Sequence, residues 1–445
     1  MAEQIQKVPK RILNNVLSSV AAGVVPRSGA PYLAIGRKDE IGAMLHDLEV
    51  VNDGSASFRF LIGPYGSGKS FLIQLIRGYA MERDFVTADA DLSPERRLYG
   101  TSGSGVATYR ELIKNLACKV CPDGGALSGI IARWIDGIRQ SLAEQGMDPD
   151  APAFTAQLEK RIHAVVLEIE NQVGGFDFSR VIFKYYEAYI SGDDDMRSSC
   201  LRWLRGEFST RAEARKDLGF PVSVIISDEN WYEFIKLWAE LVRMIGYRGL
   251  IVFLDECVNL YKISNRISRE NNYEKILSMF NDTLQGRASG LGIVMAGTPQ
   301  FLEDTRRGLF SYEALRSRLC DSRFGTEEFV NLIGPVIRLR RLTDDELLAL
   351  LERITALYAQ QYNWQPGLSD EQLEQFLSMC LSRAGAGIMI TPREILRDYM
   401  TVLNLMMQNP DAGFEKIVQS HTPEQKTTVS AEAETSAFNP DDIVF

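Results

Sequence analysis

The sequence predicts an α/β protein: a parallel sheet interrupted by a large helical insertion and followed by a C-terminal helical lid. Three observations predict it. Short apolar runs of strand length recur at well-separated places, the block from 101 to 245 shows helical periodicity without strong strands, and amphipathic helices follow residue 341. The chain has 445 residues, a length typical of about two or three domains.

Continuous apolar runs are typical of strands that are buried on both faces of a sheet. The runs that we interpret as strands cover residues 58–62, 85–90, 250–254, 292–296 and 336–339. We expect the 250–254 strand to lie directly beside the 58–62 strand, because both lead into residues suited to one site.

Helical spacing of apolar residues predicts the remaining elements. The predicted helices cover residues 5–22, a stretch from 39, 71–81, 109–120, 127–142, 154–172, 231–245, 270–285, 311–320, 344–362, 369–382 and 391–408. After about residue 411 the chain is rich in Thr, Ser, Glu and Pro, which favours a disordered tail that ends in an acidic and apolar peptide, 441–445.

These elements suggest a division of the chain into six parts. They are an N-terminal helix at 1–30, a first part of the core at 31–100, the helical insertion at 101–245, a second part of the core at 246–340, the lid at 341–410 and the tail at 411–445.

Composition narrows the class of function. The net charge of −10 argues against a protein that coats nucleic acid non-specifically, because such binding neutralises phosphates. No apolar run reaches the ~18 residues that span a bilayer, and the polar start is unlike a signal peptide, so we expect a cytoplasmic protein without a membrane partner. Among six cysteines only Cys118 and Cys121 have a CxxC spacing, which favours reduced thiols over a zinc site.

The strongest motif follows the first predicted strand. Residues 63–70 fit G-x-x-x-x-G-K-[ST] without a mismatch and precede a predicted helix. The residues expected to bind ATP are Gly63, Pro64, Tyr65, Gly66, Ser67, Gly68, Lys69, Ser70 and Phe71. In such a loop, backbone N–H groups and the helix N-terminus face the phosphates. Lys69 reaches the β and γ phosphates, and the Ser70 hydroxyl holds Mg²⁺.

A second acidic motif completes the metal site. The apolar run 250–254 is followed by Asp255 and Glu256, which is the Walker B pattern. We expect Asp255 to hold Mg²⁺ and Glu256 to polarise the attacking water as a general base. Without the phosphate loop, the same two acids would be interpreted as a solvated strand end.

Three further segments resemble those of AAA+ ATPases. Thr298, just after the 292–296 strand, resembles a sensor 1 residue that contacts the γ-phosphate, with a plain turn as the alternative. Arg316 and Arg318 lie in a segment that resembles an arginine finger, which acts on a neighbouring subunit's nucleotide; a solvated helix face is the alternative. Arg393, beside the helix start at Thr391 and Pro392, resembles a sensor 2 arginine, against a surface arginine in a capped helix.

Near the start, Gly36, Arg37 and Glu40 look like the short motif that precedes the core of origin-recognition-like AAA+ proteins, where residues line the adenine pocket. Arg37 is therefore added to the nucleotide-binding candidates. Basic groups elsewhere are candidates for DNA contact or, by default, solvated surface: Lys7, Lys10 and Arg11; Arg96 and Arg97; and Arg338, Arg340 and Arg341.

Taken together, these residues resemble the P-loop ATP-binding proteins of BREX phage-defence systems, the BrxD-like family. Besides the phosphate loop and Asp255-Glu256, the resemblance rests on four segments: 34–37, 202–206, 246–250 and 336–343. It implies an AAA+ core, a helical lid and a role among defence proteins that distinguish self from phage DNA.

The sequence leaves rival functions open. One is an ATPase that assembles into a homo-oligomer, uses Arg316 or Arg318 in trans and acts with other defence proteins on double-stranded DNA. A second is a slow nucleotide switch that recruits partners through the insertion and tail. A weaker third is a peptide-remodelling ATPase, disfavoured because no aromatic pore-loop pattern separates the two motifs.

Overall fold

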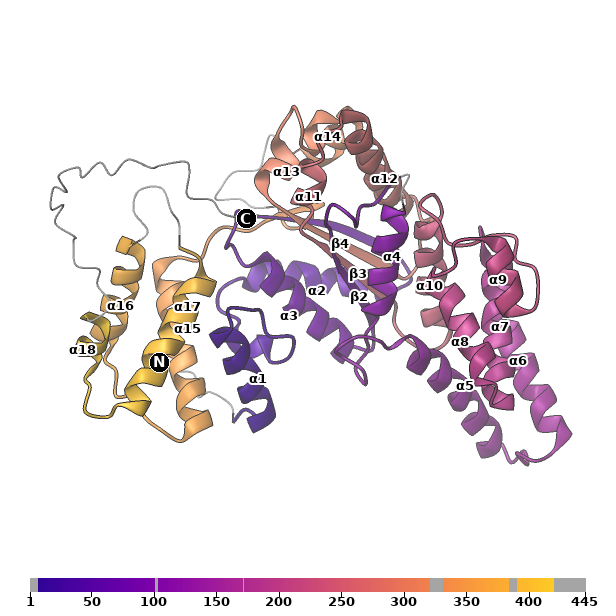
Figure 1. The fold of residues 1–445 in the computed structure, drawn as a ribbon, viewed down its shortest axis with the longest axis horizontal. Helices are drawn as coiled ribbons and strands as arrows, with labels where there is room; N and C mark the ends of the chain where they lie inside the picture. The colour runs from indigo at the N-terminus through magenta and orange to yellow at the C-terminus, as the bar shows by residue number, and fades with distance from the viewer. Residues whose placement is uncertain (1–6, 101–102, 171, 321–330, 384–389, 420–445) are drawn as a thin grey trace, which may run out of the picture.

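A five-stranded sheet lies at the centre of the computed structural model, which describes residues 7–100, 103–170, 172–320, 331–383 and 390–419 (Figure 1). All strand pairs are parallel, in the order β2-β3-β4-β1-β5. The strands are β1 (Ser57–Ile62), β2 (Val86–Asp91), β3 (Leu250–Asp255), β4 (Leu291–Gly297) and β5 (Val336–Arg338). The predicted α/β class with a parallel sheet is confirmed.

The prediction that the 250–254 strand lies directly beside the 58–62 strand is wrong. Strand β3 pairs with β2 and β4, and β4 lies between β3 and β1. Apolar runs identify strands but carry no information about their order. Because all five strands are parallel, β1 and β3 still end at the same edge of the sheet, one strand apart.

Helices cover both faces of the sheet, which is why most residues of its strands are buried. Phe58, Phe60 and Ile62 alternate toward the face covered by α4, α10 and α12, while Leu61 faces α2 and α3. These helices are α2 (Lys38–Asn52), α3 (Lys69–Glu82), α4 (Ser104–Lys114), α10 (Trp231–Met244) and α12 (Arg266–Leu284).

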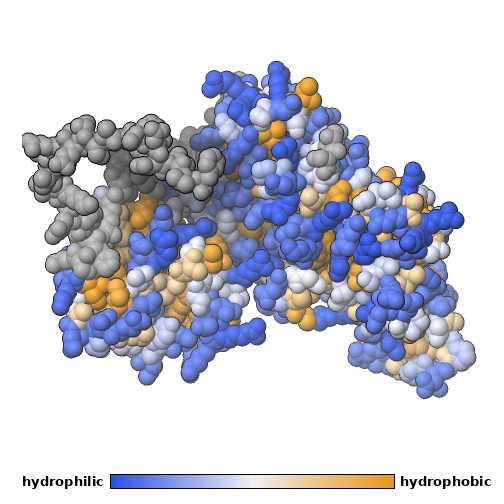
Figure 2. Space-filling view, in the orientation of Figure 1, coloured by the Kyte–Doolittle hydropathy of each residue, from blue (hydrophilic) through white to orange (hydrophobic). Residues whose placement is uncertain are grey.

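A helical arm extends from the sheet on the side of α10, at the lower right of Figure 1. Its helices are α5 (Leu127–Glu144), α6 (Pro152–Glu170), α7 (Gly175–Ser191), α8 (Asp194–Leu204) and α9 (Arg211–Leu218). Their buried side chains continue the core of the α10 face of the sheet. On the face shown in Figure 2, hydrophilic side chains predominate over the helices around α12 and α14.

The helix predicted over 109–120 ends early, at Lys114. Ala117 instead forms an antiparallel bridge with Thr87 of β2, and Asn115 donates a hydrogen bond to the carbonyl of Asp89. Pairing with the exposed edge of β2 therefore outweighs local helical preference.

The C-terminal helices form a separate core with the first helix. They are α15 (Asp344–Tyr362), α16 (Asp370–Arg383), α17 (Pro392–Gln408) and α18 (Phe414–Gln419), and α1 (Lys10–Ala21) packs on α15 and α17. The first helix begins at Lys10, later than predicted, because Pro9 disfavours helical backbone at the residue before it.

Helix α18 replaces the start of the predicted disordered tail. Residues 420–445, which hold the rest of that tail and its terminal peptide, lie outside the described residues, as do residues 5 and 6 of the first predicted helix. Within the described ranges, no helix is both long and apolar enough to cross a membrane.

Candidate nucleotide site

The phosphate loop connects β1 to α3 and is held between two neighbouring strands. The Gly63 N–H donates to the carbonyl of Gly297 at 3.1 Å, and the Leu339 N–H donates to the carbonyl of Ile62 at 2.7 Å. A Cβ at Gly63 would lie 2.4 Å from Ser67 Oγ and 3.0 Å from the Leu339 carbonyl, so only glycine fits there. The loop therefore curls tightly at the edge of the sheet.

Lys69 is the first residue of α3, and its ammonium lies inside the loop. It donates to the carbonyls of Gly63 and Pro64, at 2.8 and 3.0 Å. Burial lowers the pKa of Lys69, and the negative charges of Asp255 and Glu256 oppose that effect. The lysine is thus aimed at the space enclosed by the loop, where a phosphate would bind.

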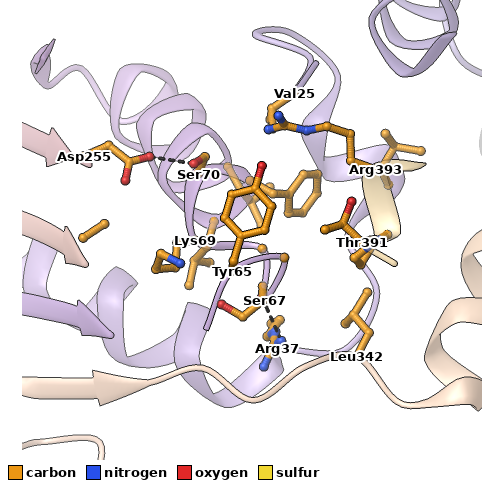
Figure 3. Close-up of a pocket in the computed structure, with 18 of the residues that line it drawn as sticks. Val25, Arg37, Tyr65, Ser67, Lys69, Ser70, Asp255, Leu342, Thr391 and Arg393 are labelled. Carbon is orange, nitrogen blue, oxygen red and sulfur yellow. Dashed lines mark hydrogen bonds between the residues drawn. The ribbon is translucent and has the colours of Figure 1, made fainter. Parts of the chain in front are cut away.

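Ser70 and Asp255 meet across the sheet edge. The Ser70 hydroxyl donates to Asp255 Oδ2 at 2.6 Å (Figure 3). Asp255 Oδ1 accepts from the Glu256 N–H at 2.7 Å. A hydroxyl beside a carboxylate is the hard oxygen set that suits Mg²⁺. Of the chain's residues, these two would hold the metal.

Glu256 stands at the point where the chain turns away from β3. Its φ of 55° lies in the left-handed region, which costs a non-glycine residue about 1–3 kcal/mol. The next residue, Cys257, returns to the sheet through a hydrogen bond from its N–H to the Ala296 carbonyl. The strained turn sets Glu256 next to Asp255, on the wall of the same pocket.

Thr298 follows β4, the strand between β1 and β3, and lines the pocket with Lys69 and Asp255. Its Oγ1 is buried and has no hydrogen-bond partner among the described residues. A buried hydroxyl without a partner is costly, and this one lines a cavity where a phosphate oxygen or water could satisfy it.

Arg393 enters the pocket from the first turn of α17. Thr391 and Glu394 form a capping box that fixes this helix start. Figure 3 shows Arg393 reaching across the pocket toward Val25. The C-terminal helices thus supply one cation to a pocket that also receives Lys69 from α3 and Asp255 from the end of β3.

The pocket has a volume of about 450 Å³, within the usual range for a small-molecule site. Its lining includes the phosphate loop, Asp255, Glu256 and Thr298. It also includes apolar side chains, which suit a base, among them Val25, Ile35, Ile41, Leu342 and Leu396.

Some predicted residues lie elsewhere. Arg316 and Arg318 are on α14 (Glu313–Leu319) and do not line this pocket; Arg318 donates to the Ala314 carbonyl of its own helix at 2.7 Å.

Arg37 lines the pocket, but its guanidinium donates to the Ser67 carbonyl and to Glu40. Tyr65 also lines the pocket but is 73% exposed.

Sequence reasoning missed several parts of the pocket wall, among them residues 23–26 and Lys262. Residues 23–26, which connect α1 to the core, showed no motif. Lys262 lies one turn after Val258 of α11 (Val258–Tyr261), so both line the pocket. Extending the helical pattern past Glu256 could have revealed Lys262.

A parallel sheet that delivers a glycine-rich loop, a lysine and a paired hydroxyl and carboxylate to one edge is typical of P-loop nucleotide-binding proteins. A family model described as "BREX system ATP-binding protein BrxC/D" matches residues 8–422, and the chain belongs to this family. The resemblance inferred from the sequence is confirmed. No curated protein matches the chain.

Proposed function

We propose that this chain is a Mg²⁺-dependent ATPase of the AAA+ type that couples ATP binding and hydrolysis to the assembly or action of a phage-defence complex on DNA. One observation carries the proposal: Lys69, the Ser70–Asp255 pair and the unpartnered Thr298 hydroxyl meet in one pocket with Glu256. Mg²⁺ would supply charge neutralisation on the phosphates, held by Ser70 and Asp255.

Each residue has a defined task in this proposal. Lys69 and the loop amides bind the phosphates, Glu256 takes a proton from the attacking water, and Thr298 orients that water or the γ-phosphate. Arg393 contributes positive charge from α17. In this assignment β1–β5 form the AAA+ core, the helical arm is an insertion and α15–α18 form the lid.

A slow switch is the second candidate. Arg316 and Arg318 lie away from the pocket of their own chain, so one chain alone supplies no arginine finger. If no second copy supplies one, the protein would bind ATP, turn it over slowly and recruit other defence proteins through the arm. Both candidates place the protein in the cytoplasm.

Specific ATPase activity, measured against protein concentration with Mg²⁺ and with or without duplex DNA, tests the proposal. A rate per molecule that rises with concentration supports an assembling ATPase whose site is completed in trans. A flat, slow rate supports the switch. The absence of both nucleotide binding and Mg²⁺-dependent hydrolysis would contradict both candidates.

A further inference from the structure

Arg37 ties the phosphate loop to the segment after β5. Its side chain is only 9% exposed and donates to the Ser67 carbonyl at 3.1 Å, to Glu40 at 3.2 Å and to the Arg340 carbonyl. A buried guanidinium needs such acceptors, since it has five N–H donors and its charge is costly to bury alone. The three acceptors come from the loop, from α2 and from the chain that leads to α15.

The next link runs through the Arg340 side chain. Its two terminal nitrogens donate to the two carboxylate oxygens of Glu346, at 2.8 and 2.7 Å. Glu346 Oε2 also accepts from the Thr343 N–H at 2.9 Å, and the Glu346 N–H donates to Thr343 Oγ1. Glu346 therefore both binds Arg340 and caps the N-terminus of α15.

Gly36 brings the two ends of this network together. Its φ is +66°, and a Cβ there would lie 2.5 Å from Glu346 Oε1. A glycine is thus required for Glu346 to pack against the backbone that precedes Arg37. Hydrogen bonds therefore connect Ser67, through Arg37 and Arg340, to Glu346 in the first turn of α15.

Resting on the proposed ATP binding, we infer that Arg37, Arg340 and Glu346 are positioning residues that couple the phosphate loop to α15. The Ser67 carbonyl and the Gly68 N–H belong to one planar trans peptide group and point in opposite directions. A phosphate bound at the Gly68 N–H fixes the orientation of this peptide plane. It therefore also fixes the direction in which the Ser67 carbonyl points toward Arg37. The position of α15 thereby depends on the nucleotide.

Hydrogen exchange on the full chain tests this coupling, with Mg²⁺ plus a non-hydrolysable ATP analogue, with ADP and without nucleotide. In the unmodified protein we expect exchange to slow by about tenfold or more in the loop and in the first turns of α15. Arg340→Ala and Glu346→Gln should keep the loop response and lose the α15 response. Glutamine can still form the capping box, so that variant separates coupling from capping.

Arg266→Ala is the matched control, because it removes an exposed arginine from an Arg–Glu pair on α12, with Glu270 at 2.7 Å; it should behave as the unmodified protein. An α15 response retained in both test variants would overturn the inference. So would a loop response without an α15 response in the unmodified protein, or an α15 already unprotected in both variants before nucleotide is added. No loop response at all would instead contradict the proposed nucleotide binding.

Discussion

The Ser70 hydroxyl donates a 2.6 Å hydrogen bond to Asp255 Oδ2, although β1, which leads to Ser70, and β3, which ends at Asp255, are not neighbours in the sheet. Ser70 reaches across because it lies in the first turn of α3, directly after the loop, while Asp255 ends β3. The parallel strands end at one edge, so a gap of one strand is spanned by two short side chains. The pair defines where a metal would bind.

Asp255→Asn should weaken Mg²⁺ binding. The amide can still accept from Ser70, so the fold is retained, but the negative ligand for the cation is lost. We expect the Mg²⁺ concentration for half-maximal ATPase activity to rise by about tenfold or more. Nucleotide binding in EDTA should change little. An unchanged Mg²⁺ requirement would remove Asp255 from the metal site.

Lys69→Ala should abolish nucleotide binding, because the β and γ phosphates lose the cation that faces them. We expect affinity to fall by about a hundredfold or more in a titration with a fluorescent ATP analogue. Lys160→Ala, at an exposed position of α6 in the arm, removes the same charge as a control. Tight binding by the Lys69 variant would rule out the phosphate-loop assignment.

Glu256→Gln should keep ATP binding and stop turnover, because the water loses its base while Ser70 and Asp255 still hold the metal. The expected fall in kcat is about 10²–10⁴-fold, the usual contribution of a general base. The strained φ is the same for glutamine, so stability should be unaffected. Hydrolysis at the unmodified rate would exclude Glu256 from this role.

The local parts of the site could be predicted from the sequence. The phosphate loop, Asp255 and Thr298 each follow an apolar run, and the structure brings them together because parallel strands end at one edge. The order of apolar, glycine, polar and acidic residues along the chain is enough to predict these parts of the site.

The remaining parts depend on contacts between distant segments. The order of β3 and β4 is a matter of which strands pair across the sheet, and these strands are far apart in the chain. The direction of Arg37 is set by carbonyls at Ser67 and Arg340, which no motif near Arg37 reveals. Residues 23–26 line the pocket because α1, which precedes them, packs on α15 and α17. The apolar stripe of α1 predicts that the helix packs against another element, but it does not identify that element.

Arg393→Ala should impair hydrolysis more than binding, because in the proposed assignment Arg393 supplies positive charge to the γ-phosphate from α17. We expect kcat/KM to fall by about tenfold, mostly through kcat. Arg397→Ala, one turn later on α17, is the matched control, since that side chain is half exposed and does not line the pocket. Equal effects of the two variants would indicate a general loss of charge on α17 instead.

Acid should destabilise α17 through its capping box. The hydrogen bond with the Thr391 hydroxyl, followed by that with the Thr391 N–H, holds the pKa of Glu394 below its usual 4.5. A lowered folded-state pKa contributes stability above the unfolded pKa, and this stability is lost as the pH falls below 4.5 through the folded value. Glu394→Gln keeps a capping side chain without this titration. The Tm advantage of the unmodified protein over this variant should therefore shrink as the pH falls from 6 to 3, measured by circular dichroism. Glu374→Gln, at an exposed position of α16, is the control. A Tm difference between the unmodified protein and the Glu394 variant that stays constant with pH would show that the Glu394 charge does not stabilise the cap.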